Sequence, residues 1–274
     1  MKLFTPLLIP VLVTLLGASA PAFAQSGEGQ TTLDDDPSAY VGAIGIYRSD
    51  YLGSGEESYG ALPYVSVDNY KGFDLFATSL SYRVLETGTG QGLGKWSLRA
   101  GPSLTYQSGR DSDDSDTLTG LEDIGASVLA GGYLRGSFGP VGFRLSAGQD
   151  IIGGHDGLSA DASIGTLLPL GRLKIQPSAT VSYGSSKFNQ TFFGITETQS
   201  DASGLAVNNV GSGINSYSAN IVSWYELGDN YAVNLVGSYR WFTEKAEDSP
   251  IILADDGADT GIFVAFGVTR KFNL

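Results

Sequence analysis

The 274-residue sequence contains no cysteine. That absence excludes disulfides, thiolate catalysis and metal sites with cysteine ligands. Histidine is nearly absent, since His155 is the only one, and charged residues make up 16% of the chain. No apolar run after residue 24 approaches the roughly 20 residues that a membrane-spanning helix needs. We therefore expect neither a disulfide framework nor a helical membrane anchor.

Basic residues are also scarce, because 16 Lys and Arg stand against 29 Asp and Glu, which gives a net charge of −13 at pH 7. An acidic chain repels the phosphate backbone of nucleic acids and lacks the basic patch that binding would require. We therefore expect no nucleic acid among the partners of the protein, and nothing in the composition indicates a cofactor.

The N-terminus has the layout of an export signal. Lys2 supplies a positive charge, Leu3–Leu16 is apolar, and Ala22 and Ala24 are small residues at a cleavage site. We expect residues 1–24 to be a signal peptide that is cleaved after export through the Sec pathway. Residues 25–38 then form a flexible acidic periplasmic leader, and residues 39–274 form a single domain.

Glycine and aromatic residues are abundant, with 38 Gly, 14 Tyr and 13 Phe, and much of the chain alternates in polarity. The stretch from Leu173 to Tyr183 is the clearest example, because its odd-numbered residues are apolar and its even-numbered residues are polar. Successive side chains of a strand point to opposite faces, so this strand has one apolar and one polar face. Pro177 removes one backbone donor, so we expect a break, bulge or seam there.

Similar alternating segments of about ten residues recur and define the candidate strands. They lie at 40–48, 61–68, 72–83, 95–107, 123–136, 140–151, 157–168, 172–183, 214–226, 231–242 and 261–272, with a weaker one at 188–194.

Two all-β folds produce this alternation. A soluble β-sandwich buries the apolar faces in one core, whereas a transmembrane barrel turns them toward lipid. The export signal, the glycines on polar faces and strands long enough to cross a bilayer at a tilt favour an antiparallel outer-membrane β-barrel. Arg270 interrupts the apolar face of the last strand, so we expect it at the membrane interface.

The clear candidate strands number eleven, whereas single-chain bacterial barrels have an even number of strands. Counting the segment at 188–194 gives twelve strands, which we prefer, and losing one N-terminal segment gives ten. With twelve strands and both termini in the periplasm, the acidic connection 107–121 falls on the periplasmic side. Long connections normally face outside, so this conflict favours ten.

Charged residues on the polar faces are predicted to line the lumen of the barrel. They form either a network of ion pairs that fills the lumen or a pore lining that sets selectivity. A barrel of ten to twelve strands favours the filled lumen, because open porins have about 16 strands or more. The residues concerned are Arg99, Arg135, Arg144, Asp150, Lys174 and Arg240.

Three groups of residues resemble the signatures of a known family, the MltA-interacting protein (MipA/OmpV) family, over about residues 40–272. The residues are Gly109, Arg110 and Asp111 with Gly120 and Leu121; Phe192, Phe193 and Gly194 with Ser203 and Gly204; and Asp248, Ser249 and Pro250.

The resemblance implies a barrel in the outer membrane of Gram-negative bacteria, in contact with lipid and lipopolysaccharide. It also implies a scaffold, not an enzyme, that joins a lytic transglycosylase to a peptidoglycan synthase in cell-wall growth. Other members of the family are described as porin-like proteins or adhesins, so a small channel and a surface adhesin remain alternative functions.

Three further segments need an interpretation: the acidic loop, the segment around His155 and residues 188–205. Asp111, Asp113 and Glu122 have the spacing of calcium ligands, but the glycine that such a loop needs is missing, so a solvated surface loop is the preferred interpretation. His155 lies in a glycine-rich segment typical of a turn, and we expect no catalytic role for it. Residues 188–205 are too aromatic for a free loop, and we expect them to fold against or into the barrel.

Overall fold

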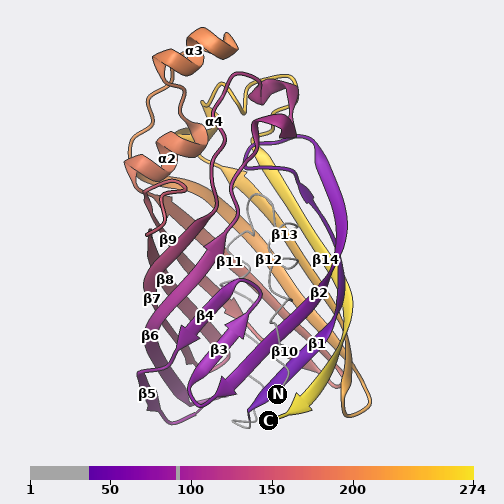
Figure 1. The fold of residues 1–274 in the computed structure, drawn as a ribbon. Helices are drawn as coiled ribbons and strands as arrows, with labels where there is room; N and C mark the ends of the chain where they lie inside the picture. Colours follow the sequence, from indigo (N-terminus) through magenta and orange to yellow (C-terminus); the bar gives the residue numbers. More distant parts are fainter. Residues whose placement is uncertain (1–36, 91–92) are drawn as a thin grey trace, which may run out of the picture.

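The computed structural model describes residues 37–90 and 93–274, which form one antiparallel β-sheet that closes into a barrel (Figure 1). Closure occurs where β1 pairs with β14, from Ser38 opposite Asn273 to Arg48 opposite Phe263. The expected all-β barrel is therefore confirmed. No helix within the described ranges is long and apolar enough to cross a membrane.

The strands are β1 (Ser38–Ser49), β2 (Glu57–Tyr70), β3 (Phe73–Phe76), β4 (Ser79–Tyr82), β5 (Leu85–Gly88), β6 (Trp96–Gln107), β7 (Ser127–Phe138), β8 (Val141–Asp150), β9 (Leu158–Thr166), β10 (Leu168–Leu170), β11 (Leu173–Gly184), β12 (Gly213–Leu227), β13 (Tyr231–Phe242) and β14 (Thr260–Asn273). The helices are η2 (Ser112–Asp114), η3 (Asp116–Leu118), α2 (Ser186–Phe193), α3 (Glu197–Ser203) and α4 (Glu244–Glu247).

Two positions in the barrel wall are each filled by a pair of short strands. β4 and β5 both pair with β6, and β9 and β10 both pair with β11. Each pair of short strands therefore completes one strand of the wall, and twelve strands surround the barrel. The preferred count of twelve is confirmed.

The identity of the twelve strands differs from the prediction. Residues 72–83 were expected to form one strand, but they form the β3–β4 hairpin, which turns at Ala77 with a φ of 48°. Residues 188–194 were expected to add a weak strand, but they belong largely to helix α2. The helix is favoured because Ser185 caps its first turn and because Phe188 and Phe192, four residues apart, share its buried face.

The hairpin also resolves the conflict over sidedness. Because β3 and β4 are two strands, β6 runs away from the end of the barrel where β1 begins and β14 ends. The acidic connection 108–126 therefore lies at the opposite end. The expectation that twelve strands place this connection in the periplasm was wrong, because it counted residues 72–83 as one strand.

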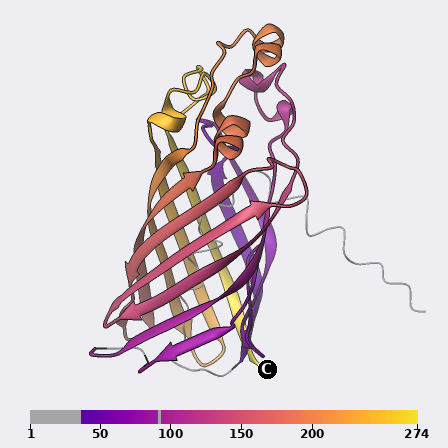
Figure 2. The same ribbon diagram turned by 90° about the vertical axis from the view of Figure 1, so that its left-hand side faces the viewer.

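The two ends of the barrel differ in the length of their connections. At one end the amide of Leu274 donates to the carbonyl oxygen of Pro37 at 2.9 Å, and turns as short as residues 139–140 and 228–230 join the strands. The other end carries the long connections 108–126 and 185–212 (Figures 1 and 2). Short turns face the periplasm in outer-membrane barrels, so the long connections lie outside the cell.

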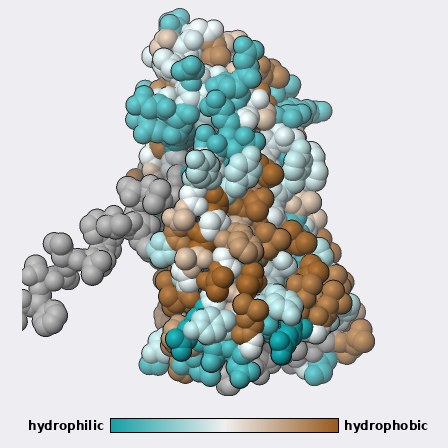
Figure 3. Space-filling model, turned by 90° about the vertical axis from the view of Figure 1, so that its right-hand side faces the viewer, coloured by the Kyte–Doolittle hydropathy of each residue, from teal (hydrophilic) through white to brown (hydrophobic). Residues whose placement is uncertain are grey.

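The barrel is apolar outside and polar inside. Among its exposed side chains are Leu145, Ile164 and Phe266, whereas Thr180, Ser218 and Thr269 are buried. On the face drawn in Figure 3, apolar side chains, shown in brown, form a belt across the middle of the molecule between polar ends. This distribution is typical of a barrel with lipid outside and polar groups inside.

The β11 strand confirms the expectation for Pro177. Strand β9 pairs with β11 from Ser178 onward, and β10 resumes the pairing at Ile175, so Gln176 and Pro177 lie at the seam between the two. The guanidinium of Arg270, as expected, lies at the periplasmic edge, over the rings of Tyr231 (5.6 Å) and Phe272 (4.9 Å).

The predicted signal peptide, residues 1–24, lies outside the described residues, as do residues 25–36 of the predicted leader. The leader was expected to extend to residue 38, but β1 already begins at Ser38.

Candidate functional site

The outer end of the barrel carries a small globular assembly, which we call the cap. It consists of the five connections at residues 50–56, 108–126, 151–157, 185–212 and 243–259. Two clusters of buried apolar side chains hold four of these connections together. The first cluster contains Leu52, Ile124, Phe188, Phe192, Phe193, Phe242, Ala246 and Ile252, and the second contains Tyr51, Leu118, Leu121, Ile195 and Ile251.

Contacts within the cap cross the mouth of the barrel. The hydroxyls of Ser115 and Thr117, in the β6–β7 connection, both donate to the carboxylate of Asp256, in the β13–β14 connection. In the ring of strands, β1 to β4 separate these two connections on one side, and β8 to β12 separate them on the other. The contact therefore joins opposite sides of the rim.

The carboxyl group of Asp256 is ionised, as an acceptor of two hydroxyl hydrogen bonds should be. Burial acts to raise the pKa of its carboxyl group, but the hydrogen bonds from Ser115 and Thr117 outweigh burial and hold the pKa below its ordinary value. The carboxylate is therefore charged at neutral pH, and its hydrogen bonds are charge-assisted.

Arg110 forms a second link across the cap. Its Nη1 donates to the carbonyl oxygen of Phe192 at 3.2 Å, and its guanidinium lies 6.0 Å from the centroid of the Tyr51 ring. The side chain is 5% exposed, and this burial lowers its pKa to about 10. The guanidinium therefore remains a cation at neutral pH. In this largely apolar setting its hydrogen bond to Phe192 is stronger than the same bond would be in water.

The structure gathers all the signature residues in this cap. Gly109 and Gly120 are needed for close packing, because a Cβ would lie 1.6 Å from the oxygen of Ile124 at Gly109 and 2.7 Å from the oxygen of Ala202 at Gly120. Gly204 ends α3 in a left-handed conformation. The other signature residues there are Arg110, Asp111, Leu121, Phe192, Phe193, Gly194, Ser203, Asp248, Ser249 and Pro250.

The segment expected to fold against or into the barrel folds against its rim. Residues 186–203 form α2 and α3 above the strands (Figure 2). Phe192 and Phe193 are buried in the first apolar cluster, at 4% and 1% exposure. The two aromatic rings therefore belong to the core of the cap.

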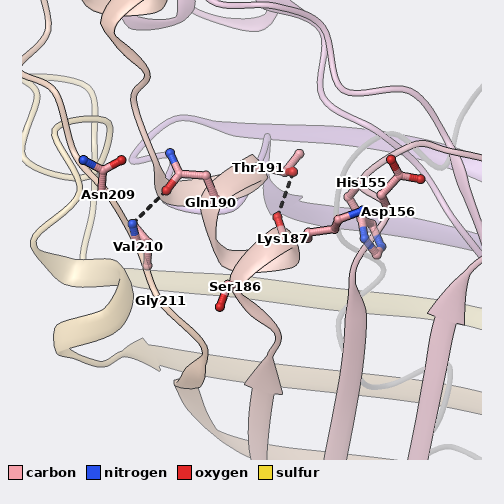
Figure 4. Close-up of a pocket in the computed structure, with 9 residues that line it drawn as sticks. All are labelled: His155, Asp156, Ser186, Lys187, Gln190, Thr191, Asn209, Val210 and Gly211. Atoms are coloured by element: carbon pink, nitrogen blue, oxygen red, sulfur yellow. Dashed lines mark hydrogen bonds between the residues drawn. The ribbon is translucent and has the colours of Figure 1, made fainter.

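A cleft of about 660 Å³ opens beside α2 (Figure 4). One side is formed by His155 and Asp156, and the other by α2 and residues 209–211. Most of its lining residues are of polar types, and Lys187 is one of three cations in the five outer connections. The lining residues are His155, Asp156, Ser186, Lys187, Gln190, Thr191, Asn209, Val210 and Gly211.

His155 has a structural position in the wall of this cleft. Its Nδ1 accepts the amide of Gly157 at 2.9 Å, and its ring packs edge-on against Phe188 at 5.0 Å. Burial lowers the pKa of the imidazole, although Asp150 and Asp156 act to raise it. These contacts make His155 part of a turn and of the packing of α2, as the glycine-rich segment suggested.

The acidic loop uses its carboxylates to order its own backbone. Asp111 caps η2 and accepts the amide of Asp113, while Asp123 accepts the amide of Ser112 at 2.8 Å. This backbone hydrogen bond holds the pKa of Asp123 below its ordinary value. Within the described ranges no three acidic or histidine side chains are grouped to hold a metal ion, so Asp111, Asp113 and Glu122 are not brought together as ligands.

The residues predicted to line the lumen occupy several different settings. Arg135 lies 3.3 Å from Asp74, and Arg99 lies 2.6 Å from Glu86. Asp74 and Glu86 were missed, because the short strands that position them, β3 and β5, were not recognised in the sequence.

The other four lie in separate places. Arg144 is 7% exposed, with its guanidinium 5.0 Å from the ring centroid of Tyr133, and Arg240 faces inward on β13 near Asp161. Lys174 lies at the periplasmic rim, 3.6 Å from Glu226. Asp150, at the outer end of β8, accepts the amides of Ile152, His155 and Asp156. A role of these residues in a pore remains a prediction.

Comparisons with known proteins agree with this architecture. A family model described as "MltA-interacting protein MipA" matches residues 41–272. Outer membrane protein OmpV of Vibrio cholerae is 26% identical over 230 residues, which cover 83% of this chain and 85% of OmpV. The MltA-interacting protein of Escherichia coli K12 is 26% identical over 179 residues, which cover 65% and 69% of the two chains.

Among solved structures, the CymD monoaromatic hydrocarbon channel aligns over 94% of each chain, with 8% identity and a TM-score of 0.43. A likeness at this level carries no argument about function.

Proposed function

The chain belongs to the MltA-interacting protein (MipA) family of outer-membrane proteins, and we propose that it is a scaffold that holds murein-hydrolysing and murein-synthesising enzymes at the outer membrane. The name of the Escherichia coli relative supports the first class of partner, a lytic transglycosylase. The second, a peptidoglycan synthase, follows from the role expected of the family.

The observation that carries this proposal is the link between Ser115 and Asp256 across the outer mouth. A barrel whose rim is joined across its opening by packed connections suits an anchor better than an open porin. Enzymes of the periplasm reach only the opposite rim. That rim presents exposed basic side chains on its short turns, among them Lys71, Lys95 and Arg172, and it suits a partner with an acidic surface.

Affinity capture from solubilised envelopes tests the scaffold. The tagged wild-type protein is expected to retain a lytic transglycosylase and a peptidoglycan synthase. A variant with Lys71→Glu, Lys95→Glu and Arg172→Glu is expected to lose both, because its rim repels the same partners. Lys187→Glu is the matched control, since it reverses a cation in the cap. Capture of neither enzyme by the wild type contradicts the proposal.

A small channel is the first alternative function, and conductance measurements in planar bilayers test it. The scaffold is expected to give no stepwise conductance, because the cap bridges the mouth. Regular conductance steps from the wild-type protein favour the channel.

A surface adhesin is the second alternative, and the charge of the cap favours it. The five outer connections together carry seventeen acidic and three basic residues. Such a surface attracts cationic partners. Loss of host-cell binding after replacement of the acidic residues of 111–116 by asparagine and serine favours this alternative.

A further inference from the structure

One wall of the cleft beside α2 is a turn whose shape is fixed by hydrogen bonds. The amides of His155 and Asp156 both donate to the carboxylate of Asp150, at 2.8 and 2.9 Å. The side chain of Gln149 donates to the carbonyl oxygen of Asp156 at 3.0 Å. These contacts hold Asp156 at a φ of 52°, which is uncommon for a residue other than glycine. Backbone conformations of this kind persist where neighbouring groups fix them, and they cluster at ligand sites.

The opposite wall, the segment that follows α3, is fastened to α2 by side chains. Gln190 accepts the amide of Val210 at 2.8 Å and donates to the carbonyl oxygen of Asn208 at 3.2 Å. Asn189 donates to the carbonyl oxygen of Gly211 at 2.9 Å. Both walls are therefore preformed, as in most sites for small molecules. The cleft volume of about 660 Å³ lies within the range of roughly 300–1,000 Å³ that such sites have.

The polar side chains that line the cleft fall into two groups. Some are used within the protein, since the Ser186 hydroxyl accepts a backbone amide at 3.1 Å and the Thr191 hydroxyl donates to a backbone carbonyl at 2.9 Å. Within the described ranges, three others make no hydrogen bond or ion pair through their side chains: Lys187, Asp156 and Asn209. One ammonium, one carboxylate and one carboxamide are therefore available to a ligand.

The two available charges have opposite signs and come from facing walls. Figure 4 shows the side chain of Lys187 extending from α2 toward His155 and Asp156. The rest of the cap is strongly acidic, with seventeen acidic and three basic residues in the five outer connections. A ligand with net negative charge is repelled by this surface, and a simple cation is repelled by Lys187 inside the cleft. A neutral molecule that carries one charge of each sign is matched by both walls.

We propose that this cleft binds a small zwitterion of the amino-acid type, in which an ammonium and a carboxylate are attached to the same carbon. Lys187 pairs with the carboxylate of the ligand, and Asp156 accepts hydrogen bonds from its ammonium group. The carboxamide of Asn209 both donates and accepts, so it bonds to either group. The site faces the outside of the cell, and it is therefore separate from the periplasmic rim that the scaffold uses.

The first experiment measures binding to the full chain in nanodiscs by saturation-transfer difference NMR. The probes are L-leucine, isopentylamine, which is leucine without its carboxylate, and 4-methylpentanoate, which is leucine without its ammonium group. Each analogue leaves one charge of the cleft without a partner, and a hydrogen bond to a charged group is worth about tenfold in affinity. Leucine is expected to bind about tenfold more tightly than either analogue.

The second experiment repeats the leucine titration with variants of the two walls. Lys187→Gln and Asp156→Asn each remove one charge and keep a polar side chain, and asparagine tolerates the positive φ at position 156. Both are expected to weaken leucine binding about tenfold. The matched controls are Lys245→Gln and Asp255→Asn, which change the same charges at exposed positions of the cap outside the cleft. Neither control is expected to change the affinity.

The proposal is overturned if the wild type does not bind leucine, or if it binds either analogue as tightly as leucine. Equal losses in the cleft variants and in their controls also overturn it, because the effect is then one of net charge. Tighter binding of phosphoethanolamine, the head group of a zwitterionic lipid, overturns the assignment to amino acids. If a cleft variant does not fold, the comparison of probes on the wild type decides the question.

Discussion

The guanidinium of Arg110 donates to the carbonyl oxygen of Phe192 at 3.2 Å, and so joins the β6–β7 connection to helix α2. The two residues are 82 positions apart in the chain, and they come from two different groups of residues that resemble signatures of the family. The contact shows that the two segments belong to one packed cap.

Replacement of Arg110 by methionine is expected to loosen the cap. The change keeps an unbranched side chain but leaves the Phe192 carbonyl without its donor, which costs about 1–3 kcal/mol. Hydrogen exchange of residues 185–212 is expected to accelerate while the strands stay protected. Arg172→Met, at an exposed periplasmic turn, is the control, and equal exchange in both variants contradicts the assigned role.

Alanine substitutions at Gly120 and Gly228 distinguish the cost of backbone strain from the cost of a steric clash. Both have a positive φ, 85° and 74°, but a Cβ meets nothing within 4 Å at Gly228 and meets the oxygen of Ala202 at 2.7 Å at Gly120. Gly228→Ala is expected to cost about 1 kcal/mol for the left-handed conformation. Gly120→Ala adds a clash of roughly 1–3 kcal/mol. A similar fall in Tm for the two variants refutes the assigned packing role of Gly120.

Asp256 is expected to stabilise the cap through its two hydroxyl donors. Asp256→Ala leaves Ser115 and Thr117 without their acceptor, at a cost of about 1–3 kcal/mol. Limited proteolysis of the outer connections in intact cells measures the effect. The exposed neighbour Asp255 supplies the control, since Asp255→Ala is expected to leave the cleavage rate unchanged.

The pH dependence of Asp256 follows from its lowered pKa. A carboxyl group with a folded pKa below its unfolded value contributes stability above the unfolded value and loses it as pH falls through the folded pKa. The difference between the wild type and Asp256→Ala is therefore expected to be full at pH 7 and to shrink below about pH 4.

His155 is expected to make the cap sensitive to mild acid. Its folded pKa is lowered by burial, so below the ordinary value of about 6.5 the unfolded segment binds a proton that the folded one does not. Stability is then present at pH 7.5 and falls as pH drops below that value. Protonation also turns Nδ1 into a donor that faces the amide of Gly157.

Hydrogen exchange of α2 at pH 7.5 and pH 5, corrected for the intrinsic rate, tests this expectation against His155→Gln. Asp150, Asp156 and Lys187 are the charged groups that lie near the imidazole, and the comparison with His155→Gln separates its contribution from theirs. If the variant shows the same change in protection as the wild type, His155 is not the responsible group.

Part of the fold could be predicted from the sequence, because the alternation of apolar and polar residues along a strand depends only on local sequence. Strand β11 begins at Leu173, where its apolar alternation begins, and Pro177 lies at a seam because a proline cannot donate to a ladder. The β3–β4 hairpin was not readable, because its turn at Ala77 contains neither glycine nor proline. Helix α2 left a signal in the spacing of Phe188 and Phe192 that was taken for part of a strand.

Less of the candidate site than of the fold could be predicted from the sequence. Resemblance to a family named the signature residues, but nothing in the sequence places Gly120 against Ala202 or Ser115 beside Asp256. Such contacts join segments far apart in the chain, and they exist only once the barrel brings their strands to one rim.

The sequence by itself determined that the protein is an exported all-β chain with one apolar and one polar face on most strands. The reason is that side-chain alternation is a property of each strand alone. Only the tertiary structure decided which end carries the acidic connections and that they pack into a cap. It also placed Val222, Ala265 and Ile46 in one row inside the barrel, because ladder register and closure align residues of different strands.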